Sequence, residues 1–590
     1  MKEIGKVTNS TPGNIQMLLS GVEVFERNKQ HMRVSRYVVI ADGNETKILA
    51  SIQNISAVQN EKTETINYTL TAAPIGSYIE NEEKIEFKQG GVNLPSPTEP
   101  VYLPEDDLIN QIFSCNENFS FEIGKLSNNK NIRYYVDGNK FFGKHIAVVG
   151  STGSGKSCAV ASILQKVMHI SDGENRMRAE KKNSHIIIFD IHSEYRSAFS
   201  LNQEQDFTLN VLDVEKLCLP YWLMNSQELE VLFIESNEMN SHNQISQFKK
   251  AVILSKEKHN SHMQHINYDT PAYFDISEVY RYIKNKNHEI INKVEGQSQL
   301  PKRADGTLID NPDVTYLNEE VKFAASSQAG ATKATNGPYT GDFERFITRL
   351  ETKLSDKRLK FITAPIKDNG ESYKTEDFDS ILMQFLGYID KANVTIIDLS
   401  AIPFEVLSIV ISLLSRVIFD FAFHYSKIMH EQQLVNDIPF MLVCEEAHNY
   451  IPKSGGAEYN ASKHSIERIA KEGRKYGLNL MVVSQRPSEV SETIFSQCNN
   501  FVVLKLTNVN DQNCIKNLLP DNNSSLVDVL PTLAAGECLM VGDSVPLPAI
   551  IKMEMPNPSP SSSNVDVYDE WNKEWIDVVF ENIIKRWRKE

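Results

Sequence analysis

The sequence lacks the patterns that would support a disulfide framework or a structural metal centre. Its seven cysteines are scattered over 590 residues, with no CxxC pair and no Cys/His cluster at zinc spacing. Disulfide-rich folds and zinc modules depend on such spacing, so neither is expected. An excess of basic residues is also lacking, since the formal net charge is −16 at pH 7. This balance argues against a surface coated with nucleic acid but leaves room for a narrow basic channel; the short basic cluster at 176–182 is more typical of a solvated helix end.

An apolar leader is also lacking. Residues 1–6 are polar and run into strand-like sequence, so we expect no secretory signal. The longest apolar stretch, residues 402–423, contains Glu405, Arg416 and Asp420. Charges inside the stretch predict a buried helix instead of a membrane span. We therefore expect a cytoplasmic protein that does not bind a membrane.

Two patterns divide the chain. Residues 1–125 contain short alternating polar and apolar stretches separated by turn clusters, which is typical of a small β-barrel or sandwich. From about residue 141 onward, apolar strands alternate with longer helical stretches, which predicts an α/β fold with a mostly parallel sheet. The strands of this sheet are predicted at residues 145–149, 185–190, 393–398, 439–444, 478–483 and 501–505.

The α/β pattern is interrupted at residues 221–355, where the sequence is mostly helical and polar. We interpret this stretch as an inserted helical bundle with a flexible loop at 326–341. The two halves of the α/β core are then 126–220 and 356–555. Residues 556–590 begin with a Pro/Ser-rich linker and end in a helix with three tryptophans. A helix of that composition needs a partner surface.

The strongest functional signal is a phosphate-binding loop after the predicted strand at 145–149. Residues 150–157 read G-x-x-x-x-G-K-S, and the strand–loop–helix context makes this pattern a nucleotide site. The glycines let backbone N–H groups surround the phosphates, and the helix N-terminus adds its dipole. Lys156 is expected to reach the β- and γ-phosphates and Ser157 to place its hydroxyl on Mg²⁺. The predicted ATP-binding residues are Gly150, Ser151, Thr152, Gly153, Ser154, Gly155, Lys156, Ser157 and Cys158.

Two further predicted strands end in acids. Glu445 and Glu446 follow the strand at 439–444, at the sheet edge where ligands bind in open α/β folds. We expect Glu445 to hold Mg²⁺, directly or through water, and Glu446 to act as general base on the attacking water. Asp190 and Glu194 follow the strand after the P-loop helix. They are expected to order the catalytic water or the metal shell, or else to cap the following turn.

Two polar side chains near the strand at 478–483 complete the predicted catalytic set. Gln485 lies at the tip of that strand, next to the acid strand, where it can sense the γ-phosphate. Arg474 precedes the strand in a basic run. In ring ATPases an arginine from one protomer neutralises developing charge in its neighbour's site. The alternative for Arg474 is a helix-end arginine that complements the helix dipole.

These runs, in this order, resemble the HerA branch of the HerA/FtsK superfamily of ring-forming DNA translocases. The resemblance implies a HAS-type N-terminal barrel and a RecA-like P-loop core with an inserted helical bundle. It also implies a homo-hexamer that threads double-stranded DNA, with a separately encoded nuclease or NAD-consuming effector as partner in DNA processing or antiphage defence. The matching runs are 145–157, 190–195, 445–448, 472–477 and 484–487.

The sequence departs from the family pattern at three places. The motif that corresponds to residues 190–195 usually reads Asp-Pro-His-Gly-Glu-Tyr, whereas Ile191 and Ser193 stand here for the proline and the glycine. The acid pair usually begins with aspartate, and here it begins with Glu445. One extra methylene still allows contact with Mg²⁺, so we expect an altered rate with activity retained. Lys144 stands where relatives can carry an arginine, which puts a second trans-acting cation in doubt.

Two functions follow from these patterns. The first is an ATP-driven DNA translocase or helicase. The second is a nucleotide-stabilised ring that assembles and activates an effector with little movement on DNA. The second is motivated by the net charge of −16, the altered acid pair and the lack of a nuclease signature in the sequence.

Overall fold

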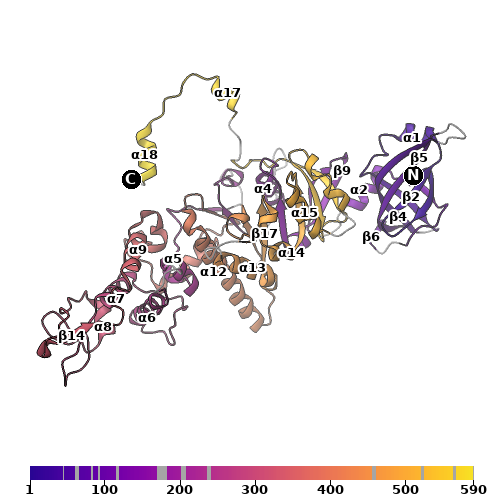
Figure 1. Ribbon diagram of the computed structural model, residues 1–590. Coiled ribbons are helices and arrows are strands. Elements are labelled where there is room, and N and C mark those ends of the chain that lie inside the picture. Colours follow the sequence, from indigo (N-terminus) through magenta and orange to yellow (C-terminus); the bar gives the residue numbers. More distant parts are fainter. Residues whose placement is uncertain are drawn as a thin grey trace. The chain divides into compact units, whose positions relative to one another are not determined.

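The computed structural model of the chain (Figure 1) divides into two compact units. One contains Met1–Leu209, Ala422–Ser454 and Glu467–Ser562, and the other contains Asn210–Phe421, Gly455–Ile466 and Ser563–Glu590. The structure describes residues 1–43, 46–59, 66–81, 84–90, 93–114, 119–168, 183–200, 208–234, 241–454, 460–519, 524–561 and 566–588. The basic cluster at 176–182 lies outside these ranges.

The N-terminal part of the first unit is a closed β-barrel, drawn in indigo in Figure 1. Its strand order is β2-β1-β7-β3-β4-β5-β6, and β2 also pairs with β5, so six of the described strands close on themselves. Ile15, Met17 and Leu19 of β2 are buried while the residues between them are exposed. This alternation confirms the predicted barrel. Its strands are β1 (Lys2–Ser10), β2 (Ile15–Leu19), β3 (Tyr37–Asp42), β4 (Thr46–Gln59), β5 (Ile66–Asn81), β6 (Lys84–Gln89) and β7 (Pro100–Leu103).

A second sheet forms the α/β core, with the order β12-β15-β11-β16-β17-β10-β18-β19-β20-β8-β9. The pairings from β11 through β16, β17 and β10 to β18 are parallel. On its other side β18 pairs antiparallel with β19, and the pairings from there to β9 are also antiparallel. The strands are β8 (Ser120–Leu126), β9 (Asn129–Asp137), β10 (His145–Val149), β11 (His185–Asp190), β12 (Leu209–Leu212), β15 (Val394–Asp398), β16 (Phe440–Cys444), β17 (Leu478–Ser484), β18 (Cys498–Leu504), β19 (Glu537–Gly542) and β20 (Ala549–Met553).

The centre of this sheet is apolar on both faces. Every residue of β10, β16 and β17 is buried, which is the burial expected of parallel strands covered on both sides. The predicted α/β P-loop core is therefore confirmed, but its sheet is mixed, with a parallel centre and an antiparallel extension from β18 to β9. Strand β18 begins at Cys498 instead of residue 501. The described helices of the first unit include α1 (Val22–Asn28), α2 (Asp106–Phe113), α3 (Gly138–Phe142), α4 (Lys156–Val167), α14 (Glu492–Gln497), α15 (Val509–Leu518) and α16 (Ser524–Val527). Helix α13 (Asn460–Glu472) contributes residues to both units.

The second unit is mainly helical. The stretch predicted as a flexible loop, 326–341, instead contains β14 (Ala334–Asn336), which pairs antiparallel with β13 (Ile290–Asn292). Reciprocal backbone bonds between Ser327 and Ala334, both 2.9 Å, hold the turn before β14. The helices are α5 (Ser226–Phe233), α6 (Ser241–His259), α7 (Ile276–His288), α8 (Pro312–Asn318), α9 (Glu344–Ser355), α10 (Lys360–Thr363), α11 (Phe378–Phe385) and α12 (Phe404–Glu431).

Helix α12 is the apolar stretch recognised in the sequence. It is long and apolar enough to cross a membrane, but 78% of its most apolar window is buried inside the protein, so the predicted buried helix is confirmed. Its Arg416 forms an ion pair of 2.8 Å with Glu228, whose side chain is fully buried. Ser412 of the same helix also donates to Glu228, at 2.8 Å. The buried Glu228 carboxylate explains how the charge of Arg416 is accommodated inside the apolar run.

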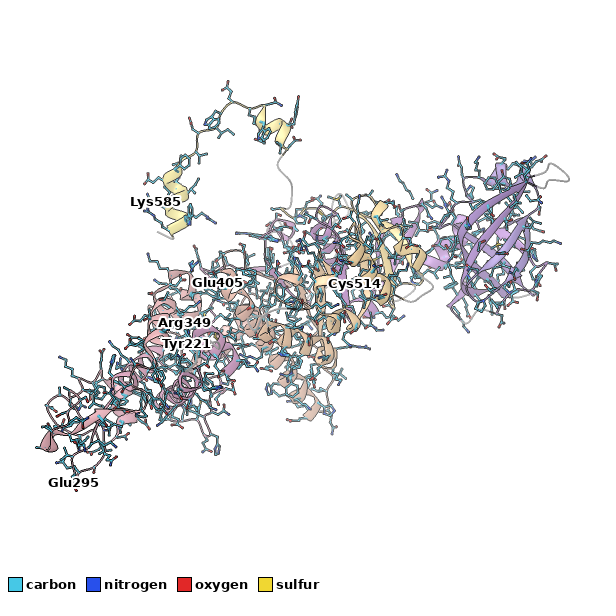
Figure 2. All side chains as sticks on the ribbon, viewed as in Figure 1. Tyr221, Glu295, Arg349, Glu405, Cys514 and Lys585 are labelled. Atoms are coloured by element: carbon cyan, nitrogen blue, oxygen red, sulfur yellow. The ribbon has the colours of Figure 1, made fainter. Side chains whose placement is uncertain are left out.

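The C-terminal segment forms two short helices, α17 (Val567–Trp571) and α18 (Phe580–Arg588). Figure 2 draws their side chains, with Lys585 of α18 labelled. The tryptophans at 571, 575 and 587 are 85%, 94% and 84% exposed. We call residues 566–588 the C-terminal arm.

Candidate nucleotide site

The phosphate-binding loop has the backbone that its glycines predict. Gly153 and Gly155 have φ angles of +73° and +97°, in the left-handed region that favours glycine. At Gly150, a Cβ atom would lie 2.5 Å from the Ser154 hydroxyl oxygen and 2.8 Å from the Leu504 Cβ. The loop leads directly into α4, so its N–H groups and the helix N-terminus face one anion site.

Backbone bonds from neighbouring segments hold this loop. The Gly150 N–H donates to the Ser484 carbonyl at 3.2 Å, and the Ser151 N–H donates to the Lys505 carbonyl at 2.8 Å. These carbonyls come from the ends of β17 and β18, the two strands that flank β10. The P-loop is therefore fixed by the sheet before any nucleotide is bound.

The side chains of the first turn of α4 face acidic partners. Burial lowers the pKa of Lys156, and three nearby carboxylates oppose the shift. The Ser157 hydroxyl donates to the Glu194 carboxylate at 2.6 Å. Cys158 is half-buried in the same turn. The three carboxylates that act on Lys156 belong to Glu446, Glu445 and Glu194.

The two acid motifs come together at the end of β16. Glu445 is 2% exposed, and burial raises its pKa well above the ordinary value, reinforced by Asp190, Glu194 and Glu446 and by a hydrogen bond with Asp190. Among the described atoms, one carboxylate oxygen of Glu445 and one of Glu446 are buried without a hydrogen bond. Buried carboxylate oxygens without a hydrogen bond favour binding of a cation.

Magnesium fits this donor set. Within the described ranges, no three or more His, Cys, Asp or Glu side chains are arranged to enclose a metal ion. Mg²⁺ in nucleotide sites does not need such a cage, because it is held by one or two protein ligands together with phosphates and water. The protein ligands expected from the sequence are the Ser157 hydroxyl, which is bonded to Glu194, and the Glu445 carboxylate, which has a buried oxygen without a hydrogen bond.

Glu446 has an unusual backbone. Its φ and ψ are 45° and 47°, a left-handed conformation that costs a non-glycine residue on the order of 1–2 kcal/mol. The Glu446 carbonyl accepts from the Asn449 N–H at 2.9 Å, and Tyr450 donates its hydroxyl to the Glu445 carbonyl at 2.9 Å. His448 Nδ1 lies 3.3 Å from the Glu446 carboxylate. The surrounding turn therefore fixes the side chain that we expected to act as base.

Asp190 both caps the turn after β11 and contacts the acid pair. It is fully buried, and its two oxygens accept from the N–H groups of Glu194 and Tyr195 at 3.1 and 2.9 Å. It thus caps the turn after β11, the alternative considered above, and it also hydrogen-bonds Glu445. Ser193, which replaces the glycine of the resembled motif, has a φ of +58°. A glycine is common there because the turn needs a left-handed residue.

Gln485 is placed directly against the P-loop. It follows β17, whose last residue Ser484 lies opposite Val149 in the sheet. The Thr152 hydroxyl donates to the Gln485 side-chain oxygen at 2.5 Å. A polar group bonded to the tip of the loop is positioned to respond to the outermost phosphate.

Arg474 is not brought to this site. It lies in a short 3₁₀ turn, Gly473–Tyr476, and is exposed. Its carbonyl accepts from the Gly477 N–H at 3.4 Å, while its guanidinium forms no hydrogen bond or ion pair with any described residue. Its charge instead helps to lower the pKa of His145, at the opposite end of β10 from the P-loop. Lys144 is engaged by Asp543 in an ion pair of 2.5 Å.

Sequence reasoning assigned no role to two groups that the structure adds. His448 lies beside Glu446, and burial lowers its pKa although the Glu446 carboxylate opposes the shift. Its position two residues after the acid pair was the available signal. The segment Pro556–Ser561, interpreted as a linker, instead bonds to α4 and to the turn after β11.

The chain is similar in sequence to known HerA helicases over most of its length. The family model described as "Helicase HerA, central domain" matches residues 121–418. The chain is 24% identical over 576 residues to the DNA double-strand break repair helicase HerA of Sulfolobus acidocaldarius, covering 95% of this chain and 96% of the relative. Identity to the protein of the same name from Pyrococcus furiosus is 23% over 512 residues, with 80% and 78% covered. Among solved structures, VirB4 of Thermoanaerobacter pseudethanolicus matches 75% of this chain and 98% of its own, at 14% identity and a TM-score of 0.44.

Proposed function

This chain belongs to the HerA helicase family, whose central-domain model matches half of its length, and we propose that it is an ATP-driven translocase of double-stranded DNA. The resemblance drawn from the strand-end motifs is confirmed by that match, and ATP hydrolysis follows from it. DNA as the track is carried over from relatives named as DNA double-strand break repair helicases. The observation that carries the proposal is the gathering of acidic side chains around Lys156 and Ser157 at one edge of the sheet.

The residues of the site account for each part of the hydrolysis. The loop N–H groups and Lys156 bind the triphosphate and offset its charge. Ser157 and Glu445 would hold Mg²⁺, which would neutralise part of the phosphate charge when bound. Glu446 takes a proton from a water molecule while the oxygen of that water bonds to the γ-phosphorus. The bond between the γ-phosphorus and the bridging oxygen breaks at the same time, and that oxygen leaves with ADP. Gln485, bonded to the P-loop, orients the γ-phosphate.

We assign Arg474 to the site of a neighbouring copy. The loop that binds nucleotide follows Val149 and the arginine lies near His145. Five residues of strand separate these two positions, which corresponds to about 15 Å. An exposed guanidinium near the far end of the P-loop strand is available to stabilise transition-state charge across a subunit border. This arrangement supports the homo-hexamer that the family resemblance implies.

The proposal is tested first with Glu446→Gln, which keeps the side-chain volume and removes the base. We expect ATP binding to be retained and hydrolysis to fall by about 10²- to 10⁴-fold, as for loss of a general base. DNA movement, measured by displacement of a labelled strand, should be lost together with hydrolysis. Turnover at the wild-type rate would show that Glu446 is not the base.

The shared site is tested by mixing two inactive variants. Lys156→Ala damages the nucleotide pocket and Arg474→Ala damages the proposed border cation, so each alone should have little ATPase activity. In mixed assemblies some borders pair an intact pocket with an intact arginine, and we expect partial recovery. Light scattering gives the assembly mass. No recovery, or a monomer with and without nucleotide, would contradict a site formed between copies.

The second candidate, a scaffold that activates an effector, is favoured by the C-terminal arm. Its tryptophans at 571, 575 and 587 are exposed, and exposed aromatic clusters mark interaction surfaces. The effector would be a separately encoded nuclease or NAD-consuming enzyme. ATPase measured with and without duplex DNA separates the two functions. Stimulation by DNA supports the translocase, whereas no stimulation, with effector activation intact in Glu446→Gln, supports the scaffold.

A further inference from the structure

Residues Pro556–Ser561, which follow the last strand of the sheet, form a strap across the P-loop helix. The strap is rich in proline and serine and is bonded to the core mainly through its backbone. It lies within the same compact unit as the P-loop and the acid motifs. Its contacts with that unit converge on two places.

The first place is Gln165 of α4, the helix that begins with Lys156. Gln165 is 3% exposed, and its amide nitrogen donates to the carbonyls of Pro558 and Ala198 at 2.7 and 2.8 Å. Its oxygen accepts from the Asn557 N–H at 3.0 Å. One buried amide therefore joins the P-loop helix, the turn after β11 and the strap.

The second place is the turn that carries Glu194. The Ser197 hydroxyl donates to the Ser559 carbonyl at 2.9 Å, and the Ser561 hydroxyl donates to Ser197 at 2.8 Å. The Ser561 N–H donates to the Glu194 carbonyl at 2.9 Å. Glu194 is thereby held at its carbonyl by the strap, while the Asp190 carboxylate accepts from its N–H at 3.1 Å.

We propose that the strap and its anchors Gln165 and Ser197 are positioning elements of the ATP site, which fix Glu194 as the acceptor of the Ser157 hydroxyl proton. A serine that gives a lone pair to Mg²⁺ must donate its proton elsewhere, and Glu194 already accepts that proton at 2.6 Å. Partners of a metal ligand that orient it raise metal affinity. The strap thus acts on the metal through Glu194 and touches neither nucleotide nor metal.

This inference rests on the proposed ATP site, and it is tested on the full chain with point variants. Ser197→Ala removes the hydroxyl that joins the strap to the Glu194 turn. Gln165→Leu removes the buried amide at similar volume. The matched control is Ser559→Ala, because among the described residues the Ser559 hydroxyl bonds only within the strap, to the Pro556 carbonyl at 2.9 Å. Its own carbonyl, which accepts from Ser197, is unchanged in that variant.

The readout is ADP affinity by titration calorimetry, once in a chelator and once with excess Mg²⁺. All four proteins should bind ADP alike without metal. The gain in ADP affinity on adding Mg²⁺ should be about 5-fold smaller in Ser197→Ala and Gln165→Leu, as for loss of one net hydrogen bond. In Ser559→Ala this gain should be the same as in wild type. With ATP, the half-saturating Mg²⁺ concentration should rise in the same two variants.

The outcomes separate this inference from the function on which it rests. A wild-type gain with Mg²⁺ that Ser197→Ala and Gln165→Leu retain in full would overturn the role of the strap and leave the ATP site standing. A wild-type chain without any Mg²⁺ gain would overturn the proposed site and the strap together. Because Ser197 is only half-buried, its variant keeps the test decisive even if Gln165→Leu fails to fold.

Discussion

Replacing His145 with asparagine should remove an acid-sensitive element from the ATPase core. His145 is the first residue of β10 and is 3% exposed. Its Nε2 bonds to the Ala470 carbonyl at 2.9 Å, and its Nδ1 accepts from the Leu480 N–H at 3.0 Å. A donor bond at Nε2 and an acceptor bond at Nδ1 define the neutral ring. The ring therefore ties the P-loop strand to the segments on both sides of Arg474.

The magnitude follows from the pKa. Burial, with a smaller contribution from the Arg474 charge, lowers the pKa of His145 from 6.5 to about 4, against the opposing effect of the Ala470 bond. Below pH 6.5 the unfolded chain takes up a proton that the folded chain refuses, so acid favours unfolding. Between pH 6.5 and 4 this one group removes stability progressively, about 2 kcal/mol by pH 5 and about 3 kcal/mol by pH 4.

Asparagine can keep an acceptor near Leu480 but cannot be protonated. At about pH 7.5 we expect His145→Asn to be less stable than wild type by about 1–2 kcal/mol, because the bond to Ala470 is lost. At about pH 5 the difference in stability between wild type and His145→Asn should close, since only the wild type loses the stability that depends on an unprotonated His145. Because the entropy of unfolding grows with the number of residues, a change of about 2 kcal/mol corresponds to about 3 °C in the melting temperature of a unit as large as the first one.

Differential scanning calorimetry at the two pH values measures this change. Other groups also titrate over this range, so the decisive quantity is the difference between wild type and variant at each pH. His192→Asn, which replaces an exposed histidine in the same unit, should follow the wild type at both values. If His145→Asn and wild type lost the same stability between the two pH values, the assignment of a neutral buried ring would be refuted.

Two further predictions concern other parts of the chain. Gln485→Leu removes the acceptor of the Thr152 hydroxyl, and we expect kcat for ATP to fall about 10- to 100-fold with ADP affinity nearly unchanged, because binding rests on the loop amides; a rise in KM alone would place Gln485 in ground-state binding. Arg416→Met leaves the buried Glu228 carboxylate without its ion pair and should destabilise the helical unit by about 3–5 kcal/mol. Adding Glu228→Gln should recover part of that loss in calorimetry, and a single variant as stable as wild type would contradict the buried pair.

The parallel centre of the sheet was predictable because its signals are local. The strands at 145–149 and 439–444 are continuous apolar runs, and their polar ends place the P-loop and the acid pair at one edge. The antiparallel extension was not predicted, since β8 and β20 are short and pair across more than 400 residues of chain, as in Leu126 with Ile551. Pairing at that distance is decided by tertiary packing and not by local pattern.

The candidate site divides in the same way. Residue type and strand position were enough to bring Glu445, Glu446 and Asp190 together in the expectation. They could not give the left-handed backbone of Glu446, which depends on the turn that follows it. Composition also misrepresented Pro556–Ser561 as a linker, because its bonds to Gln165 use backbone groups that every sequence carries.

The position of His145 bears on how a ring of such chains would couple its sites. His145 is the first residue of β10, and the P-loop follows the last residue of that strand. One short buried strand therefore connects the phosphate-binding loop to the segments on both sides of Arg474, which His145 contacts. Strands packed on both faces move as rigid bodies because interiors are close to crystal density. In the proposed hexamer, a shift of the P-loop on phosphate release would therefore displace the arginine offered to the next copy.

His145→Asn should then weaken cooperativity in ATP hydrolysis at about pH 7.5 more than it weakens ADP binding, because the nucleotide pocket is intact and only its link to Arg474 is loosened. Equal losses in both would indicate a general destabilisation and no such coupling.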